Sequence, residues 1–419
     1  MKEKSIWKVI LLSGIGGMLE MYDFIIFIVF AHELGLVFFP KEIGSLATVY
    51  TLGVFAVGYL ARPIGGMLFA HFGDRYGRKK IFALSIVLMA LSTFLIGVLP
   101  GYVSWGVIAS LLFILFRIIQ GLAVGGELPG AITFVYEHVK SHATFAVGVL
   151  FCFVNLGILL ASVVYAMIYY FLPAADAEAY GWRVAFILGG FLAIVGYYLR
   201  KKLNETPEFK AYEKEIKKQS VPIIELFTKH LKSLFSTSLL MALMATIVGL
   251  VFLYLTAYLQ GRINYTDLEI SSLHLFGLVV LPISIIIWSF IGQSARNKKK
   301  VYVGIVIVLM IVLIPAYKEI IHHDYQWIAY FVLICLCGGI YALSPTLVAD
   351  SYPVSVRYNG VAFGYNMAFA IFGGLTPLIA NLLSYQKITE IAPAWILLVA
   401  SIIGLLGLFI GSFKQKRAS

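Results

Sequence analysis

The chain has 419 residues, of which 61% are hydrophobic and 13% are charged, and its mean hydropathy is +0.92. This composition excludes a soluble globular domain and is typical of an integral membrane protein. The net charge of +11 would suit an anionic partner, but most of the 32 lysines and arginines fall in short polar segments on one side of the predicted spans. The positive-inside rule accounts for this charge, so we expect no nucleic-acid partner.

Twelve apolar windows follow one another along the chain, each about as long as a helix that crosses a bilayer. They lie near residues 9–30, 44–70, 80–99, 105–127, 143–170, 183–199, 233–258, 268–292, 300–317, 327–349, 358–384 and 393–412. The excess of lysine and arginine on one side places both termini in the cytoplasm. The sequence therefore predicts an all-α integral membrane protein with twelve transmembrane helices.

The longest polar segment follows the sixth predicted span and divides the chain into two halves. We predict an N-terminal six-helix bundle at 1–199, a cytoplasmic linker at 200–232 and a C-terminal six-helix bundle at 233–419. The stretch "GDRYGRKK" at 73–80, after the second span, is echoed by "GQSARNKKK" at 292–300, after the eighth. Two parallel six-helix repeats are the pattern of the major facilitator fold, whose substrate site lies between the halves near the midplane.

Two acids interrupt the first span. Glu20 and Asp23 are three residues apart, hence on one helix face, and lie roughly 18 to 22 Å above the cytoplasmic surface. A charge at that depth costs at least about 2.5 to 3.5 kcal/mol unless it has a partner, water or a proton. Arg117 in the fourth span reaches a similar depth, and protonating an adjacent acid would free this cation for an anionic substrate group. The alternative is a fixed ion pair that only holds two helices together.

Other polar residues in the spans have less specific interpretations. Arg62 either reaches the cytoplasmic interface along its own aliphatic stem or faces the substrate. Glu127, one helical turn from the membrane edge, is either a half-solvated acid or a proton-coupling group. Tyrosine and asparagine side chains in helix bundles usually serve packing, but they also select substrates. We predict proton coupling by Glu20, Asp23, Arg117 and Glu127, and substrate binding by Tyr22, Arg62, Gln120, Asn155, Tyr254, Tyr258, Tyr365 and Asn366.

The loop "GDRYGRKK" combines two glycines, an acid and a basic cluster at a helix end. Asp74 suits the N-terminus of a neighbouring helix, and Arg75 and Arg78 suit carboxylates such as Glu137. Ordinary positive-inside charges are the alternative, but they require neither the glycines nor the acid. The second copy has Gln293 in place of the acid, so we expect the C-terminal half to lack the acid of its own clamp. The gating residues that we predict are Asp74, Arg75, Arg78, Glu137, Asp350 and Arg357.

This loop resembles the signature loop of the major facilitator superfamily, which helps to lock the outward-facing state. Further stretches resemble its metabolite:proton symporter branch, which includes citrate, 2-oxoglutarate, shikimate and proline/betaine carriers. These stretches are "LEMYDF", "RIIQGLAVGGELPGA", "GWRVAFILGG", "RKKLNETPEF" and "YPVSVRYNGVAFGYN". The resemblance implies proton-coupled uptake of a small polar metabolite, such as an organic acid, amino acid or betaine, by alternating access. The alternative is a proton-coupled exporter, because the loop also occurs in exporters.

Other functional classes lack their sequence signals. A membrane enzyme would need a nucleophile with its base, or a metal cluster at membrane depth, and neither pattern is visible. A sensor would carry a soluble output domain, whereas the longest polar segment is a lysine-rich linker. We therefore expect no enzymatic activity, no cofactor and no metal. The expected partners are a small-molecule substrate, protons and the lipid bilayer, for a monomer in the inner (cytoplasmic) membrane of the cell.

Overall fold

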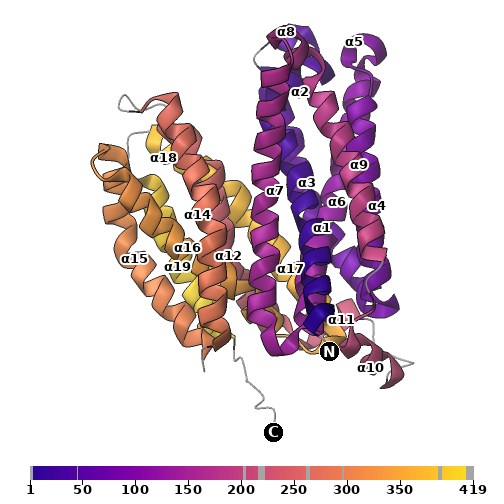
Figure 1. Cartoon of the computed structure of the whole chain (residues 1–419), viewed down its shortest axis with the longest axis vertical. Helices are drawn as coiled ribbons and strands as arrows, with labels where there is room; N and C mark the ends of the chain where they lie inside the picture. Colours follow the sequence, from indigo (N-terminus) through magenta and orange to yellow (C-terminus); the bar gives the residue numbers. More distant parts are fainter. Residues whose placement is uncertain are drawn as a thin grey trace. The chain divides into compact units, whose positions relative to one another are not determined.

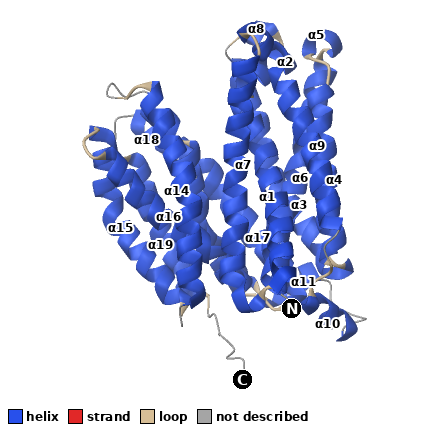
Figure 2. Ribbon diagram, in the orientation of Figure 1, coloured by secondary structure: helices blue, strands red, loops and turns tan. Residues whose placement is uncertain are grey.

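The computed structural model of the chain describes residues 3–44, 46–201, 204–215, 222–260, 265–294, 297–385 and 389–411. Every regular element among these residues is helical, and none is a strand (Figure 2). Twelve helical segments of this described part are long and apolar enough to cross a membrane. The predicted fold class is confirmed.

The chain packs into two compact units. The first contains Met1–Ala131 and Phe153–Lys210, and the second contains Ile132–Cys152 and Ala211–Ser419. Residues 132–152, which form the corner between two consecutive helices, thus pack with the second unit although they precede the predicted linker. The domain boundaries at 199 and 233 remain predictions.

The helices that lie wholly or partly in the first unit are labelled in Figure 1. In chain order they are α1 (Glu3–Val29), α2 (Ala31–Phe38), α3 (Leu46–Tyr76), α4 (Arg78–Val98), α5 (Tyr102–Trp105), α6 (Val107–His138), α7 (Ala143–Phe171), α8 (Ala174–Asp176), α9 (Trp182–Lys201) and α10 (Pro207–Glu215), with short 3-10 or π turns at Lys41–Ile43, Lys140–His142 and Ala177–Gly181. Of these, α7 begins in the second unit. Within the first unit α9 packs against α1 and α4, and α3 packs against α2 and α4.

Glycines bring α3 and α6 into backbone contact. A Cβ at Gly121 would meet the carbonyl oxygen of Gly58, and one at Gly125 would meet that of Arg62. The two α6 glycines are four residues apart and therefore share one helix face. Membrane helices approach closely through such small residues, because lipid offers no hydrophobic drive for association. The contact sets the arginines of these two helices at the same level of the unit.

The second unit contains the remaining helices. They are α11 (Pro222–Lys229), α12 (Leu231–Ile247), α13 (Leu255–Gln260), α14 (Asp267–Ser294), α15 (Lys298–His322), α16 (Gln326–Ala349), α17 (Arg357–Ala368), α18 (Gly374–Tyr385) and α19 (Ala392–Ile410), with a 3-10 turn at Val354–Val356 and π turns at Val248–Leu253 and Phe369–Gly373. The central helix α12 packs against α16, α17 and α19, and α16 packs against α14 and α15. The two π turns contact each other and interrupt the seventh and eleventh spans. Such turns occur often at functional sites.

Candidate functional site

Helix α1 carries both predicted acids into the interior of the first unit. Glu20 and Asp23 are 2% and 3% exposed. Tyr22 lies between them, and its hydroxyl donates a hydrogen bond of 2.9 Å to the carbonyl oxygen of Ala185 in α9. This bond anchors α1 to α9, so the backbone that carries the acids is fixed. Tyr22, predicted as a substrate ligand, uses its hydroxyl for this internal contact.

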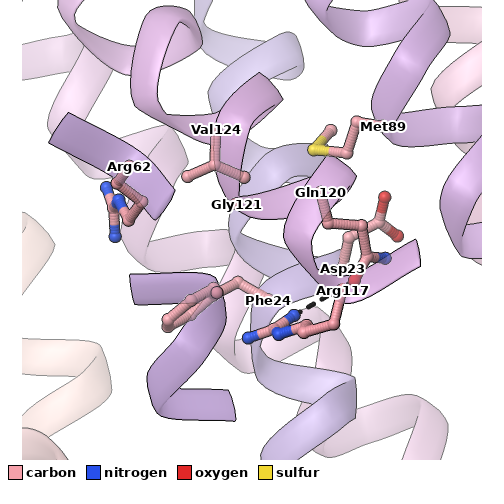
Figure 3. A pocket seen from close by; sticks show the side chains of 9 residues that line it. Asp23, Phe24, Arg62, Met89, Arg117, Gln120, Gly121 and Val124 are labelled. Atoms are coloured by element: carbon pink, nitrogen blue, oxygen red, sulfur yellow. Dashed lines mark hydrogen bonds between the residues drawn. The ribbon is translucent and has the colours of Figure 1, made fainter. Parts of the chain in front are cut away.

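Three hydrogen bonds link Arg117 to Asp23. Nη1 of Arg117 donates to Oε1 of Gln120 at 3.2 Å, and Nε2 of Gln120 donates to Oγ1 of Thr93 at 2.7 Å. The Thr93 hydroxyl donates to Oδ2 of Asp23 at 3.1 Å. The first of these bonds is drawn in Figure 3. The row connects α6, α4 and α1, and all four side chains are buried.

Arg117 was expected to lie beside Glu20 or Asp23, and the structure does not place Asp23 in direct contact with it. No ion pair within 4.0 Å joins the two side chains in the described part of the chain, where Gln120 and Thr93 separate them. A fixed ion pair between α1 and α6 is therefore not the basis of this contact. Thr93 was not predicted, because a single threonine in an apolar span usually bonds its own helix.

The guanidinium group of Arg117 lies among aromatic rings. Its Cζ is 4.1 Å from the ring centroid of Phe27, 4.8 Å from that of Phe55 and 5.2 Å from that of Phe24. Such cation–π contacts stabilise a desolvated cation. The Nε and Nη2 groups of Arg117 are nevertheless buried without a hydrogen-bond partner among the described residues. The site therefore holds a cation with unused donors.

Arg62 belongs to the same site. It is 4% exposed, and its Cζ lies 5.2 Å from the ring centroid of Tyr59 and 5.7 Å from that of Phe24. Phe24 is therefore shared by both guanidinium groups (Figure 3). Of its two interpretations, a side chain that reaches the membrane interface is wrong, because Arg62 is buried next to the site.

A small pocket joins these groups. Its walls come from α1, α3, α4 and α6, and Figure 3 shows the side chains around it. The lining residues are Asp23, Phe24, Gly58, Arg62, Met89, Arg117, Gln120, Gly121 and Val124. Four of the residues predicted for proton coupling or substrate binding, Asp23, Arg62, Arg117 and Gln120, thus come together at one pocket.

Glu127 and Asn155 are also buried in the first unit, at 0% and 3% exposure. The half-solvated interpretation of Glu127 is therefore wrong, because the fourth span continues as helix to His138 and covers this position. Neither residue lines the pocket. Their predicted roles stay predictions.

The four predicted substrate residues of the second unit lie beside its π turns. Tyr258 donates its hydroxyl to the carbonyl oxygen of Glu390, and Asn366 donates to the carbonyl oxygen of Ala362 at 2.9 Å. The rings of Tyr254 and Tyr258 lie 5.7 Å apart, and Tyr365 stacks on Phe369 at 4.3 Å. Hydrogen bonds within the unit thus engage at least Tyr258 and Asn366. Substrate contact by these four residues stays a prediction.

A model of the Major Facilitator Superfamily matches residues 10–314. The chain belongs to this superfamily. It is 31% identical over 427 residues to the glycine betaine/proline/ectoine/pipecolic acid transporter of Dickeya dadantii, covering 98% of this chain and 84% of that protein. It is 30% identical over 419 residues to the proline/betaine transporter of Salmonella typhimurium, covering 95% and 82%. The predicted family and branch are confirmed.

A solved structure shows the same fold. The proton:xylose symporter XylE matches with a TM-score of 0.76 at 14% identity, over 98% of this chain and 95% of that chain. At this identity the likeness concerns the fold alone. Together with the transporter relatives, the family establishes a multi-pass membrane transporter of small molecules that is not an enzyme.

The superfamily signature loop is closed by residues of its own unit. Arg78 pairs with Asp74 at 3.2 Å, and both side chains are buried. Glu205 accepts a hydrogen bond of 3.0 Å from the backbone N–H of Lys79 in the first turn of α4. Gly77 makes the turn with φ of +104°, which a side chain would strain. Arg75 is exposed. Its pairing, or that of Arg78, with Glu137 stays a prediction.

Glu205 was missed as a partner of this loop. It lies in "NETPEF", where Thr206 caps α10 by accepting from the backbone N–H of Phe209 at 3.1 Å. The Arg78 guanidinium lies 5.6 Å from the Phe209 ring centroid. The sequence feature that could have identified Glu205 is a carboxylate directly before the start of a helix, because an acid in this position can reach the N-terminus of another helix.

The second copy of the loop pairs with an acid from another helix. Asp350 pairs with Lys298 at 2.6 Å and accepts a hydrogen bond from the hydroxyl of Tyr136. The expectation that this half lacks an acid is therefore wrong, because Asp350 at the end of α16 supplies it. Nearby, Arg357 pairs with Glu137 at 2.7 Å. Three predicted gating residues thus lie in one ionic cluster of the second unit.

Gln293 has a different task. Its Nε2 donates to the carbonyl oxygen of Ser141 at 2.7 Å, and its Oε1 accepts from the backbone N–H of Thr144 at 3.0 Å. An ionised aspartate has no donor and is one methylene shorter, so it cannot make both bonds. Tyr352, whose carbonyl oxygen accepts a hydrogen bond from Arg357, contacts Thr237 through its hydroxyl, and burial raises the pKa of Tyr352, which therefore stays protonated.

Proposed function

We propose that this transporter is a proton-coupled symporter that imports a small carboxylate-bearing metabolite, such as proline or a betaine, by alternating access. The proposal rests mainly on the environment of Arg117. This buried cation lines a pocket, and two of its three nitrogen groups lack a hydrogen-bond partner among the described residues. A buried charge with unused donors is costly, and a carboxylate offers the planar pair of acceptors that matches a guanidinium fork.

Asp23 is the proposed proton carrier. It lines the same pocket, and Oδ2 is bonded to Thr93, whereas Oδ1 is buried without a partner in the described part of the chain. An ionised carboxylate in this position lacks the full set of hydrogen bonds that stabilises a buried charge. Binding a proton removes the charge and supplies a donor. Asp23 is therefore suited to gain and lose a proton during transport.

The aromatic rings suggest the rest of the substrate. Phe24, Phe27, Phe55 and Tyr59 surround the two guanidinium groups. Aromatic faces also bind quaternary or secondary ammonium groups. A zwitterion with one carboxylate and one ammonium group would find both kinds of partner there. The names of the relatives in Dickeya dadantii and Salmonella typhimurium, which include proline and betaine, support this choice.

Transport into sealed vesicles tests the proposal. We expect the purified full-length protein in proteoliposomes to accumulate labelled proline or glycine betaine when the outside is more acidic, and to lose accumulation when a protonophore is added. Accumulation driven by sodium and indifferent to pH would contradict it. Accumulation of the substrate that requires a more acidic vesicle interior would support the exporter alternative. We also propose that the protein lies in the cytoplasmic membrane with both termini inside.

The signature loop is the proposed gate. Asp74→Asn removes the charge that pairs with Arg78 in a buried position, so one conformer loses its clamp while the substrate pocket is untouched. We expect net uptake to fall about tenfold or more, because a buried charged pair that loses one partner costs several kcal/mol. Proline affinity should change less than about threefold, because the variant retains all pocket contacts. Uptake rates and equilibrium binding, measured on the same preparation, separate the two effects.

Asp324→Asn is the matched control, because Asp324 is exposed in the turn between α15 and α16. Both uptake and binding of this control should equal those of the wild type. A loss of proline affinity in Asp74→Asn as large as its loss of uptake would argue against a gating role.

A further inference from the structure

The hydrogen-bond row between Arg117 and Asp23 has one possible direction when the acid is ionised. Arginine has no acceptor and an ionised carboxylate has no donor. Gln120 therefore accepts on its carbonyl oxygen and donates its amide hydrogen to Thr93, and the single hydroxyl hydrogen of Thr93 is left for Asp23. The row connects a positive end to a negative end, so each bond polarises the next.

The open oxygen of Asp23 is where a proton can add without breaking the row. Oδ2 accepts from Thr93, whereas Oδ1 is buried and has no hydrogen-bond partner among the described residues. Gly189 of α9 faces Oδ1 so closely that a Cβ there would meet it. A proton that binds Oδ1 converts the carboxylate to a neutral acid, and no other covalent bond forms or breaks.

Neutralising Asp23 weakens the whole row. Thr93 then donates to a neutral acid, and hydrogen bonds to charged acceptors are roughly twice as strong as neutral ones. The polarisation that strengthened the Gln120 bonds is lost at the same time. The Gln120 bond is the one hydrogen bond of the Arg117 guanidinium in the described part of the chain. A weaker Gln120 bond leaves this cation free to turn toward a ligand.

We propose that Thr93 and Gln120 are positioning residues that transmit the charge state of Asp23 to Arg117, so that a carboxylate-bearing substrate binds more tightly after a proton has bound. This inference rests on the proposed function and adds the physical link between the proton and the substrate. It assigns roles to a hydroxyl and an amide that carry no charge themselves.

Other charged or titratable groups act on the same acid through space. Tyr22 lies next to Asp23 on α1, and Glu20 shares its helix face. Helix α6 brings Glu127 as well as Arg117. Helix α3 brings Arg62 to the pocket, α4 brings the uncharged Thr93, and α9 brings Gly189. Among these groups, Glu127 and Arg117 act on Asp23 through space, and in the described part of the chain the row is the path that joins Asp23 to Arg117 through hydrogen bonds.

Thr93→Val tests the row, because valine keeps the branched shape of threonine and removes only the hydroxyl group. Equilibrium binding of labelled L-proline to the purified full-length protein is measured from about pH 5 to about pH 8. Wild-type affinity should rise about tenfold as the pH falls, which corresponds to one hydrogen bond to a charged group. The affinity of Thr93→Val should change less than about threefold and stay near the wild-type low-pH value.

Thr93→Ser and Ser92→Ala are the matched controls. Serine restores the hydroxyl group at position 93, so the wild-type pH dependence should return. Ser92 is the next residue of α4, and its hydroxyl bonds the carbonyl oxygen of Leu88 outside the row, so its removal should leave the pH dependence intact. If Thr93→Val does not fold, Gln120→Met breaks the row one residue further on and should give the same flat profile.

If the Thr93→Val or Gln120→Met protein keeps the tenfold pH dependence of proline affinity, the proposed role of the hydrogen-bond row is wrong. The proposed function fails by a different result, namely a wild-type protein whose proline accumulation ignores the pH gradient. The direction of the change in proline affinity distinguishes a positioning role from a structural one. At high pH, the Thr93→Val protein should bind proline more tightly than the wild type does. A structural defect would weaken binding at every pH.

Discussion

Replacing Asp23 with asparagine is expected to abolish proton-driven accumulation of proline while exchange across a preloaded membrane continues. The amide mimics the protonated acid, so the carrier can bind substrate and alternate, but it neither takes up nor releases a proton. Exchange should stay within roughly tenfold of the wild type, because at most one hydrogen bond to a charged group is lost, the one from Thr93. Uphill uptake and exchange are measured in the same proteoliposomes.

Glu20→Gln is the matched control for this experiment. Glu20 lies on the same face of α1 and is equally buried, but it does not line the pocket. We expect this variant to keep proton-driven accumulation. If Glu20→Gln uncouples and Asp23→Asn does not, Glu20 is the proton carrier. If both variants accumulate proline with the wild-type pH dependence, proton coupling lies at another residue, and Glu127 is the next to test.

The depth of the charged residues could be predicted from sequence alone. Counting the rise per residue from the cytoplasmic end placed Asp23 and Arg117 at one level, and the structure brings both to one pocket. The rule that a charge in a membrane span needs a partner selected them among many polar residues. Position along a helix axis is a local property, and therefore the sequence carries it.

The partners of these charges could not be predicted, because rotation about the helix axis and packing between helices decide them. Thr93 is one of several hydroxyl residues of α4, and nothing local separates it from Ser92, which bonds its own helix. Gly189 matters only because α9 presses it against Asp23. Both facts depend on contacts across 70 or more positions of the chain.

The cytoplasmic loops show the same limit. The repeated motif predicted two related loops, and the presence of Gln293 in place of an acid was interpreted as a loss. The structure places Asp350 where it pairs with Lys298, and it gives Gln293 two backbone bonds that need both a donor and an acceptor. A motif records which residue changed, but the compensating residue came from another helix.

Arg117 and Arg183 are expected to respond in opposite ways to the same substitution, methionine. Arg117 has unused donors in a buried pocket, whereas Nη1 of Arg183 donates to the carbonyl oxygens of Gly97 and Leu99 at 2.9 and 2.8 Å. Those carbonyls end α4 and have no partner within the helix. We therefore expect Arg117 to bind the substrate and Arg183 to stabilise the fold.

Arg117→Met should weaken proline binding roughly a hundredfold or more, because two charge-assisted hydrogen bonds to the carboxylate are lost. Its melting temperature should not fall, since methionine fills the space between Phe24, Phe27 and Phe55 without burying a charge. Arg183→Met should keep wild-type binding but lower the melting temperature by several degrees, as expected for about 1 to 3 kcal/mol of lost capping. Thermal unfolding and proline binding of the two detergent-purified variants provide the comparison. If Arg117→Met instead unfolds more than about 5 °C below the wild type, the arginine holds α6 in place, and its loss of binding would follow from a damaged fold.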